Sequence, residues 1–351
     1  MNEANTSPVG VTVDAQSLGA MMDLATGSWR AQVVHAYAAL GIADELSAGA
    51  VSADELATRL SVDRPALVRL LRAGIGLGLL NKDDRACYAA TPLLATLRRA
   101  PGSLRELVMA WSMPGIWLPW GRFLEAVRTG RAQAEATHGA SLWAYYESNP
   151  AEAALFTQSM AAITRVVAAE AAPLFDTSEH RVAIDLGGAT GDLVISMMER
   201  NPALRGAVLD LPHVIADATA AAEARGLGQR FSAIAGSFFD PLPPADLYLL
   251  KNVLHDWDDT SCMRILENCC QGLAAGGRIV IIESALPEVR TAADASPLLP
   301  MFDLAMLVLV NGRERTLAEY EALFAQARLR LHSTKPLVSL PSLLLMDVRK
   351  A

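Results

Sequence analysis

One segment of the chain combines residue types and spacing suited to binding a nucleoside. Asp185–Gly191, with the sequence Asp-Leu-Gly-Gly-Ala-Thr-Gly, directly follows a short apolar run. Glycines at a strand-to-helix turn let a ligand approach the backbone, and ligands of open α/β sheets bind beyond the carboxyl ends of the strands. Asp210 ends the next apolar run, where a carboxylate can accept both hydroxyls of a ribose.

The spacing of the glycines favours one nucleoside over another. A dinucleotide fingerprint needs Gly-x-Gly-x-x-Gly, but counted from Gly187 this chain has Ala189 and Asp192 in place of the second and third glycines. An aspartate at the third position would also repel a pyrophosphate. Asp185, before the turn, suits a ligand with a cationic amino group. S-adenosylmethionine has that group, a ribose and no phosphate, so the turn favours it over NAD.

Three further side chains are candidates for acid–base chemistry. His255 follows the apolar run 247–250, at the same end of the expected sheet as the glycine turn. Glu283 follows the run 278–282, and Glu314 follows the apolar stretch 298–310. A carboxylate that accepts a ring N–H from a histidine fixes its tautomer and stabilises its protonated form. Each residue also has an alternative interpretation. His255 could be a structural histidine, Glu283 a solvated acid at a strand end, and Glu314 part of a charged turn before a helix cap at Thr316.

The alternation of apolar runs and helical patterns after residue 176 predicts an open, mostly parallel α/β sheet. Two late apolar runs, 329–331 and 343–348, are expected to form a closing hairpin at one edge. The strands of the sheet are expected at 182–186, 206–209, 231–235, 247–250 and 278–282.

The first 100 residues show mainly helical periodicity. Ser52 and Asp63 are candidate caps of two short helices, and a polar turn at 81–84 follows the second of them. Two short helices followed by a hairpin predict a winged helix-turn-helix unit. Residues 101–175 are also helical and carry most of the large aromatic residues. We therefore divide the chain into an N-terminal helical domain (1–100), a helical segment at the substrate pocket (101–175) and an α/β domain (176–351).

Composition excludes several classes of protein. The chain has 351 residues, of which 52% are hydrophobic, and a net charge of −8, which argues against binding to phosphate backbones. Its four cysteines include no Cys-x-x-Cys pair, so neither a metal site nor a disulfide framework is indicated. No secretory pattern or bilayer-length apolar run is present. We expect a reduced, cytoplasmic protein that does not bind membranes or nucleic acid.

Together these motifs resemble the S-adenosylmethionine-dependent O-methyltransferases of the caffeate and hydroxyindole type, in particular the bacterial branch that tailors aromatic natural products. The resemblance covers almost the whole chain. It rests on motifs that occur in the same order and spacing as in the family, namely Gly187-Gly188, Asp210, Gly236–Phe239, Lys251, His255–Trp257 and Gly312–Thr316.

The resemblance implies a Rossmann-like methyltransferase domain, a winged-helix-like domain that forms a homodimer, no metal, and an aromatic acceptor such as a phenolic polyketide or phenazine. S-adenosylmethionine would be converted to S-adenosylhomocysteine. His255 would be the general base, with Glu283 and Glu314 beside it. The cofactor would be held by Asp185, Gly187, Gly188, Gly191, Asp210, Ser237, Phe238 and Lys251. The acceptor would contact Phe156, Met160, Met301, Met306 and Leu309.

Two positions depart from the family pattern. Ala189 replaces a usual third glycine, and Ser237 replaces a frequent aspartate near the adenine.

Two other functions stay open. One is a DNA-binding regulator with a ligand-sensing domain, suggested by the winged-helix unit, whose second helix carries Arg64, Arg69 and Arg72. The other is a relative that keeps the cofactor but catalyses decarboxylation or hydroxylation.

Overall fold

The computed structural model describes residues 13–287, 298–340 and 342–351, in two compact units. The first unit ends at Ser112 and the second begins at Met113. The expected boundary lay near residue 100. The helices from α8 (Pro114–Trp120) to α12 (Pro150–Leu174) belong to the same unit as the large sheet, although residues 101–175 were expected as a separate segment.

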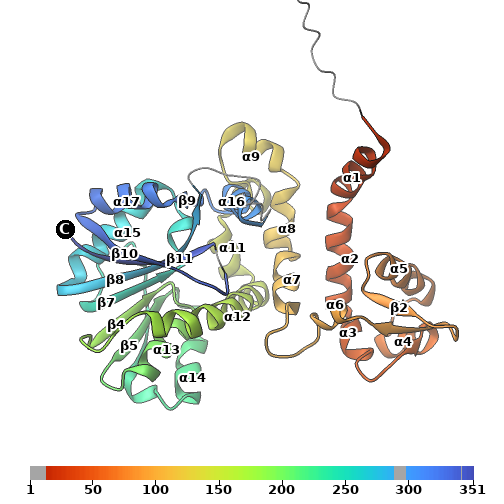
Figure 1. Cartoon of the computed structure of the whole chain (residues 1–351), viewed down its shortest axis with the longest axis horizontal. Coiled ribbons are helices and arrows are strands. Elements are labelled where there is room, and N and C mark those ends of the chain that lie inside the picture. Colours follow the sequence, from red (N-terminus) through yellow and green to blue (C-terminus); the bar gives the residue numbers. More distant parts are fainter. Residues whose placement is uncertain (1–12, 288–297, 341) are drawn as a thin grey trace, which may run out of the picture. The chain divides into compact units, whose positions relative to one another are not determined.

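The first unit is helical apart from a three-stranded sheet with the order β1-β3-β2 (Figure 1). All its strand pairs are antiparallel, and β2 and β3 form the predicted hairpin. Its elements are α1 (Ala15–Ala25), α2 (Gly27–Leu40), α3 (Ile42–Glu45), β1 (Val51–Ser52), α4 (Ala53–Leu60), α5 (Arg64–Gly76), β2 (Leu80–Lys82), β3 (Cys87–Ala90), α6 (Pro92–Ala95) and α7 (Arg105–Trp111).

Local capping explains where the two short helices of this unit begin. The Ser52 hydroxyl accepts a hydrogen bond from the Glu55 N–H, and the Asp63 carboxylate accepts one from the Ala66 N–H. Each bond satisfies a donor that the first helical turn leaves free. Both predicted caps are therefore confirmed. The unit buries a core of its own, which includes Tyr37, Leu56 and Leu71.

The second unit is built on a sheet with the strand order β10-β11-β8-β7-β4-β5-β6, to which β9 adds by pairing with β8 (Figure 1). The neighbouring strands β8, β7, β4, β5 and β6 run parallel to one another. Strand β11 runs antiparallel to both β8 and β10, so the predicted edge hairpin is confirmed. The strands are β4 (Val182–Leu186), β5 (Arg205–Asp210), β6 (Phe231–Ala235), β7 (Ala245–Lys251), β8 (Leu273–Leu286), β9 (Arg315–Thr316), β10 (Leu329–Pro336) and β11 (Leu343–Lys350).

Helices cover both faces of this sheet because alternate side chains of each central strand point to opposite sides. Ile279 and Ile281 of β8 belong to the core with α15 and α17, whereas Val280 and Ile282 belong to the core with α12, α13 and α14. The helices of the unit are α8 (Pro114–Trp120), α9 (Phe123–Thr129), α10 (Ala134–His138), α11 (Leu142–Ser148), α12 (Pro150–Leu174), α13 (Asp192–Arg200), α14 (Ala216–Ala224), α15 (Asp259–Gly272), α16 (Leu298–Leu309) and α17 (Leu317–Gln326), with 3-10 turns η1 (Gly228–Arg230) and η2 (Leu254–Asp256).

One expectation about the sheet is wrong. Glu283 was placed after the fifth strand, but β8 continues through it to Leu286. The strand is longer because β11 and β9 pair with it, and Glu283 lies opposite Leu344 of β11. The side chain is fully buried, which excludes the alternative of a solvated acid at a strand end.

Candidate functional site

The glycine turn joins the end of β4 to the start of α13. Gly187 has a φ of +67°, a backbone conformation that L side chains rarely adopt. A Cβ atom on Gly188 would lie 2.5 Å from the carboxyl carbon of Asp185. The two glycines therefore let the chain turn sharply over a buried carboxylate.

Asp210 lies at the end of β5, beside this turn. Its carboxylate accepts hydrogen bonds from the N–H of Ala189 (2.9 Å) and the N–H of Leu211 (2.7 Å). Ala189 has a φ of +49°. The carboxylate expected to bind a ribose is therefore bonded directly to the glycine turn.

The expected adenine and lysine positions lie around the same edge of the sheet. A Cβ atom on Gly187 would lie 3.6 Å from the Phe238 ring, so this ring is beside the turn. The Ser237 hydroxyl accepts a hydrogen bond from the Phe239 N–H, 3.2 Å away, and thereby stabilises its own loop. Lys251 is the last residue of β7, and its position in the strand pairs with Ile282 of β8.

His255 lies on η2, directly beyond β7. Its Nδ1 is 2.9 Å from Oε1 of Glu314, and its side chain is only 14% exposed. Because a carboxylate can only accept, Nδ1 carries the proton in this pair. Nε2 lies 3.5 Å from Oδ1 of Asp256. With Nδ1 as the donor, the neutral ring keeps a lone pair on Nε2.

Glu283 holds the backbone of the same turn. Its Oε1 accepts hydrogen bonds from the N–H groups of Val253 (2.8 Å) and Leu254 (2.7 Å). Its Oε2 is 4.0 Å from Nδ1 of His255. The structure thus brings the three expected acid–base residues together. Glu314 bonds the ring, and Glu283 bonds the backbone that carries it.

Sequence reasoning assigned no role to three residues that position these side chains. Arg315 is fully buried and donates hydrogen bonds to the carbonyl oxygens of Leu254 and Trp257. Asp303 of α16 accepts a hydrogen bond from the Glu314 N–H. A Cβ atom on Gly312 would lie 2.0 Å from the His255 carbonyl oxygen. Only the motif Gly312–Thr316 pointed to this segment, which packs directly on the histidine turn.

Burial and neighbouring charges shift the pKa values of the site. Burial raises the pKa of Asp185 to about 7, with Lys251 opposing the shift, and burial also raises the pKa of Asp210. Burial lowers the pKa of Lys251, while nearby carboxylates oppose that effect. A positively charged ligand would favour the ionised forms of the two aspartates.

The pKa of His255 shifts in the opposite direction from the one that burial alone would cause. Burial alone lowers the pKa of His255, but Asp256, Glu283 and Glu314 outweigh it and raise the pKa to about 10. Burial raises the pKa of Asp256 to about 7, although His255 opposes this shift. The carboxylates therefore make His255 a strong base that holds its proton firmly at neutral pH.

The residues expected at the acceptor lie on α12 and α16. Phe156 packs against Tyr146, with ring centroids 5.3 Å apart, in a cluster that also contains the buried Leu309. Met160 and Met306 are partly buried, and Met301 is 52% exposed. The structure therefore places Phe156 and Leu309 in one apolar cluster and leaves Met301 at the surface of its unit.

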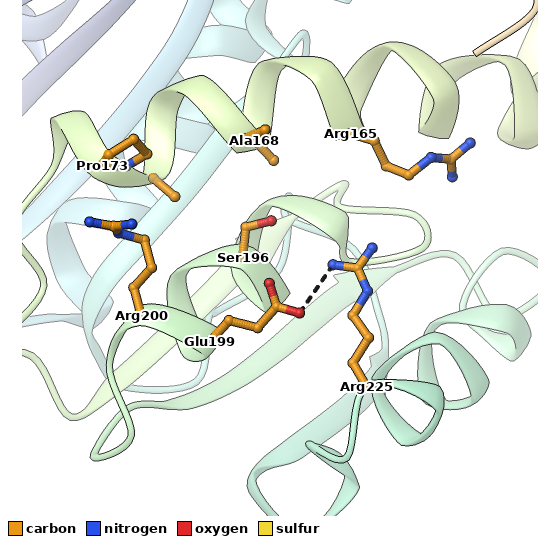
Figure 2. Close-up of a pocket in the computed structure, with 9 residues that line it drawn as sticks. Arg165, Ala168, Pro173, Ser196, Glu199, Arg200 and Arg225 are labelled. Carbon is orange, nitrogen blue, oxygen red and sulfur yellow. Dashed lines mark ion pairs between the residues drawn. The ribbon is translucent and has the colours of Figure 1, made fainter. Parts of the chain in front are cut away.

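A separate hollow of about 340 Å³ lies between α12, α13 and the end of α14. Figure 2 shows its charged rim, with Arg165, Arg200 and Arg225 around Glu199. It contains none of the expected site residues. Its lining consists of Arg165, Ala168, Ala169, Ala172, Pro173, Ser196, Glu199, Arg200 and Arg225.

The arrangement fits S-adenosylmethionine better than a phosphate-bearing cofactor. The turn offers two glycines, an aromatic ring and two carboxylates, and a carboxylate disfavours a phosphate and favours a cation. Among the described residues, no cluster of three or more His, Cys, Asp or Glu side chains could hold a metal ion. Within that same part of the chain, no helix is long and apolar enough to cross a membrane.

Comparisons with known proteins give consistent matches along the chain. A family model described as an O-methyltransferase domain matches residues 120–330, and one described as an O-methyltransferase dimerisation domain matches residues 22–98. The chain is 31% identical to mitomycin biosynthesis 6-O-methyltransferase of Streptomyces lavendulae, over 97% of each chain. It is 32% identical to the phenazine O-methyltransferase of Lysobacter antibioticus, over 91% of this chain and 93% of that protein.

A solved structure shows the same fold with ligands bound. It is an O-methyltransferase from neocarzinostatin biosynthesis in complex with S-adenosylmethionine and 2-hydroxy-5-methyl naphthoic acid. It superimposes with a TM-score of 0.83 at 29% identity and covers 97% of this chain and 100% of its own.

The pKa of His255 should fall in a Glu314→Gln variant. Removing a carboxylate 2.9 Å from Nδ1 removes one of the charges that stabilise the imidazolium, so we expect the pKa to decrease by about 1 to 3. An NMR titration of protein with 13C-labelled histidine measures it directly. Glu321→Gln, on the exposed side of α17, is the control and should leave the His255 resonance unchanged. An unaltered His255 titration in Glu314→Gln would refute the assignment of the shift to this pair.

Proposed function

This chain belongs to the S-adenosylmethionine-dependent O-methyltransferases that carry a dimerisation domain, and from that premise we propose that it methylates a hydroxyl of an aromatic natural product with His255 as the general base. The observation that carries the choice of base is the 2.9 Å bond between Nδ1 of His255 and Glu314. This bond leaves Nε2 as the nitrogen that can accept a proton.

The proposed mechanism starts from the acidity of the acceptor. S-adenosylmethionine, when bound, supplies a methyl group on a cationic sulfur. A phenol has a pKa of about 10 and is scarcely ionised at neutral pH, so its proton must be removed as the oxygen attacks. His255, with a pKa raised to about 10, matches the phenol, so proton transfer between them costs little free energy.

The same carboxylates also govern the state of His255 before reaction. His255 must be neutral to accept the proton, and its pKa of about 10 keeps it charged at neutral pH and below. The activity should therefore rise with pH. A cation bound near His255 would lower this pKa and so increase the neutral fraction. Once the proton is on Nε2, Glu314 and Glu283 stabilise the imidazolium.

We propose that the cofactor contacts the residues around the glycine turn. Asp185 would face its ammonium group, with Gly187, Gly188 and Gly191 leaving the backbone open beside it. Asp210 would bind the ribose hydroxyls. The adenine would lie near Ser237 and Phe238, with Lys251 at the end of the neighbouring strand.

The acceptor would lie against Phe156 and Met160 of α12 and Met301, Met306 and Leu309 of α16. The aromatic cluster around Phe156 supports a flat, apolar ring system, because aromatic rings pack well against one another. The phenazine and naphthoic acid in the names of the similar proteins have such rings. Helix α16 also carries Asp303, so the acceptor wall and the Glu314 segment are joined by a hydrogen bond.

The alternative of a DNA-binding regulator is weakened by the charges of the first unit. Arg64, one of the three arginines near the winged-helix unit, forms an ion pair with Asp54. Another arginine of this unit, Arg59, pairs with Glu45 and Glu55. These pairs neutralise charge that phosphate binding would need.

A cytoplasmic location of the protein stays a prediction.

A mass-spectrometric screen tests the reaction. Purified protein with S-adenosylmethionine and a panel of hydroxylated naphthoates, phenazines and quinones should give one added methyl on some of the aromatic acceptors, together with S-adenosylhomocysteine. Loss of carbon dioxide or gain of oxygen instead would favour the decarboxylase or hydroxylase alternative. The matching methyl ethers, which have no free hydroxyl, serve as the control and should not react.

Substitution of the base separates catalysis from cofactor binding. His255→Gln should reduce kcat by about 10²- to 10⁴-fold, because it removes general-base catalysis, and should leave only the rise of activity with pH that ionisation of the acceptor hydroxyl causes. The dissociation constant of S-adenosylhomocysteine, measured by calorimetry, should change little. An equal loss of turnover and cofactor affinity would assign His255 a binding role instead.

The first unit should form a homodimer interface. Helices α1 and α2 expose the large apolar side chains of Leu18, Met21, Met22, Leu24 and Trp29, and exposed apolar side chains grouped in one region are typical of protein–protein interfaces. Light scattering after gel filtration should give twice the mass of one chain. Replacing Met21 and Leu24 by glutamate should shift the mass to that of a single chain, whereas an unchanged dimer would place the interface elsewhere.

A further inference from the structure

Ala189 lies in a turn that would suit glycine better. The Gly191 N–H donates a hydrogen bond to the Gly188 carbonyl oxygen (2.8 Å), which closes a four-residue turn with Ala189 as its first central residue. Its φ of +49° is in the left-handed region, where the methyl group of alanine is disfavoured. Something outside the residue must therefore stabilise this backbone conformation.

The residues on either side of Ala189 are held by hydrogen bonds. On one side, the Ala189 N–H donates to Oδ2 of Asp210. On the other, the Thr190 hydroxyl donates to Oδ2 of Asp192, 2.8 Å away. The turn is therefore fixed between two carboxylates, one of which is the proposed ribose ligand.

Asp192 is itself anchored by two arginines. It is the first residue of α13 and is only 4% exposed. Arg225, after α14, donates to its Oδ1 at 3.0 Å, and Arg165 of α12 lies 3.7 Å from its Oδ2. Figure 2 shows these two arginines at the hollow between the helices, where Arg225 also pairs with Glu199 (3.6 Å). Because a buried carboxylate needs such partners, the three helices together fix its position.

We propose that Asp192 is a positioning residue for the cofactor site: through Thr190 it holds Ala189 in its left-handed conformation and so keeps the Ala189 N–H on the Asp210 carboxylate. A glycine at position 189 would adopt this conformation unaided. This inference rests on the proposed ribose-binding role of Asp210. It gives a role to Asp192, which takes no part in the proposed cofactor contacts or in the proposed proton transfer.

A double-mutant cycle tests the proposal. The dissociation constant of S-adenosylhomocysteine is measured by calorimetry for the wild type, Asp192→Asn, Ala189→Gly and the double variant. Asp192→Asn should raise it about tenfold, because a charged hydrogen-bond network is lost. With glycine at 189, the same substitution should raise it by no more than about threefold, since the two residues are coupled.

Kinetics add a measurement that a merely structural role would not affect. Asp192→Asn should raise the KM for S-adenosylmethionine and leave kcat at saturation within about twofold of the wild type. Adding Ala189→Gly to the Asp192→Asn variant should restore the KM for S-adenosylmethionine. Arg200→Gln is the matched control: it lines the same hollow, but no ion pair joins it to Asp192 among the described residues, and it should change neither constant.

The outcomes separate this inference from the proposed function. The positioning role would be overturned if Asp192→Asn lowered the affinity equally with alanine and with glycine at position 189. It would also be overturned if Asp192→Asn lowered the melting temperature and left binding unchanged. If Asp192→Asn does not fold, Thr190→Val removes only the hydroxyl contact and should show the same dependence on residue 189. Failure of the wild type to bind S-adenosylhomocysteine would instead overturn the cofactor assignment, and this inference with it.

Discussion

The position of His255 depends on one buried interaction, the hydrogen bonds between the carboxylate of Glu283 and the backbone of the histidine turn. A buried carboxylate that lacks hydrogen bonds would strongly destabilise the fold. The N–H groups of Val253 and Leu254 satisfy one of its oxygens. Because Glu283 lies within a central strand, its position is set by the pairing of β8 with β7 and β11. The sheet therefore fixes where the turn lies, and the turn fixes the imidazole.

The charges at this edge of the sheet explain which ligands it accepts. Acidic groups outnumber basic ones around His255 and the glycine turn, and most of them are buried. Such a region attracts cations and excludes phosphates without any direct steric conflict. The same field raises the pKa of His255. The acids that raise this pKa are Asp256, Glu283 and Glu314, whereas Asp185 and Asp210 lie at the glycine turn.

Residue patterns predict local features of this chain well and long-range contacts poorly. Apolar periodicity located the strands, and the glycines located the sharp turn between β4 and α13. The caps Ser52 and Asp63 depend only on neighbouring residues, so they were predictable. The role of Arg315 was not, because its acceptors on the histidine turn lie about 60 positions earlier in the sequence. The left-handed backbone of Ala189 was also missed, since alanine gives no signal for it.

Helix α12 joins the proposed acceptor site to Asp192, the proposed positioning residue of the donor site. Phe156 and Arg165 are nine positions apart, which places them about 13 Å apart along the helix and on opposite faces. The first packs in the aromatic cluster, and the second lies beside Asp192. Substitutions near Phe156 can therefore accumulate during evolution while the packing at Arg165 is preserved. Divergence of acceptor specificity on an unchanged donor site is the expected history of such a helix.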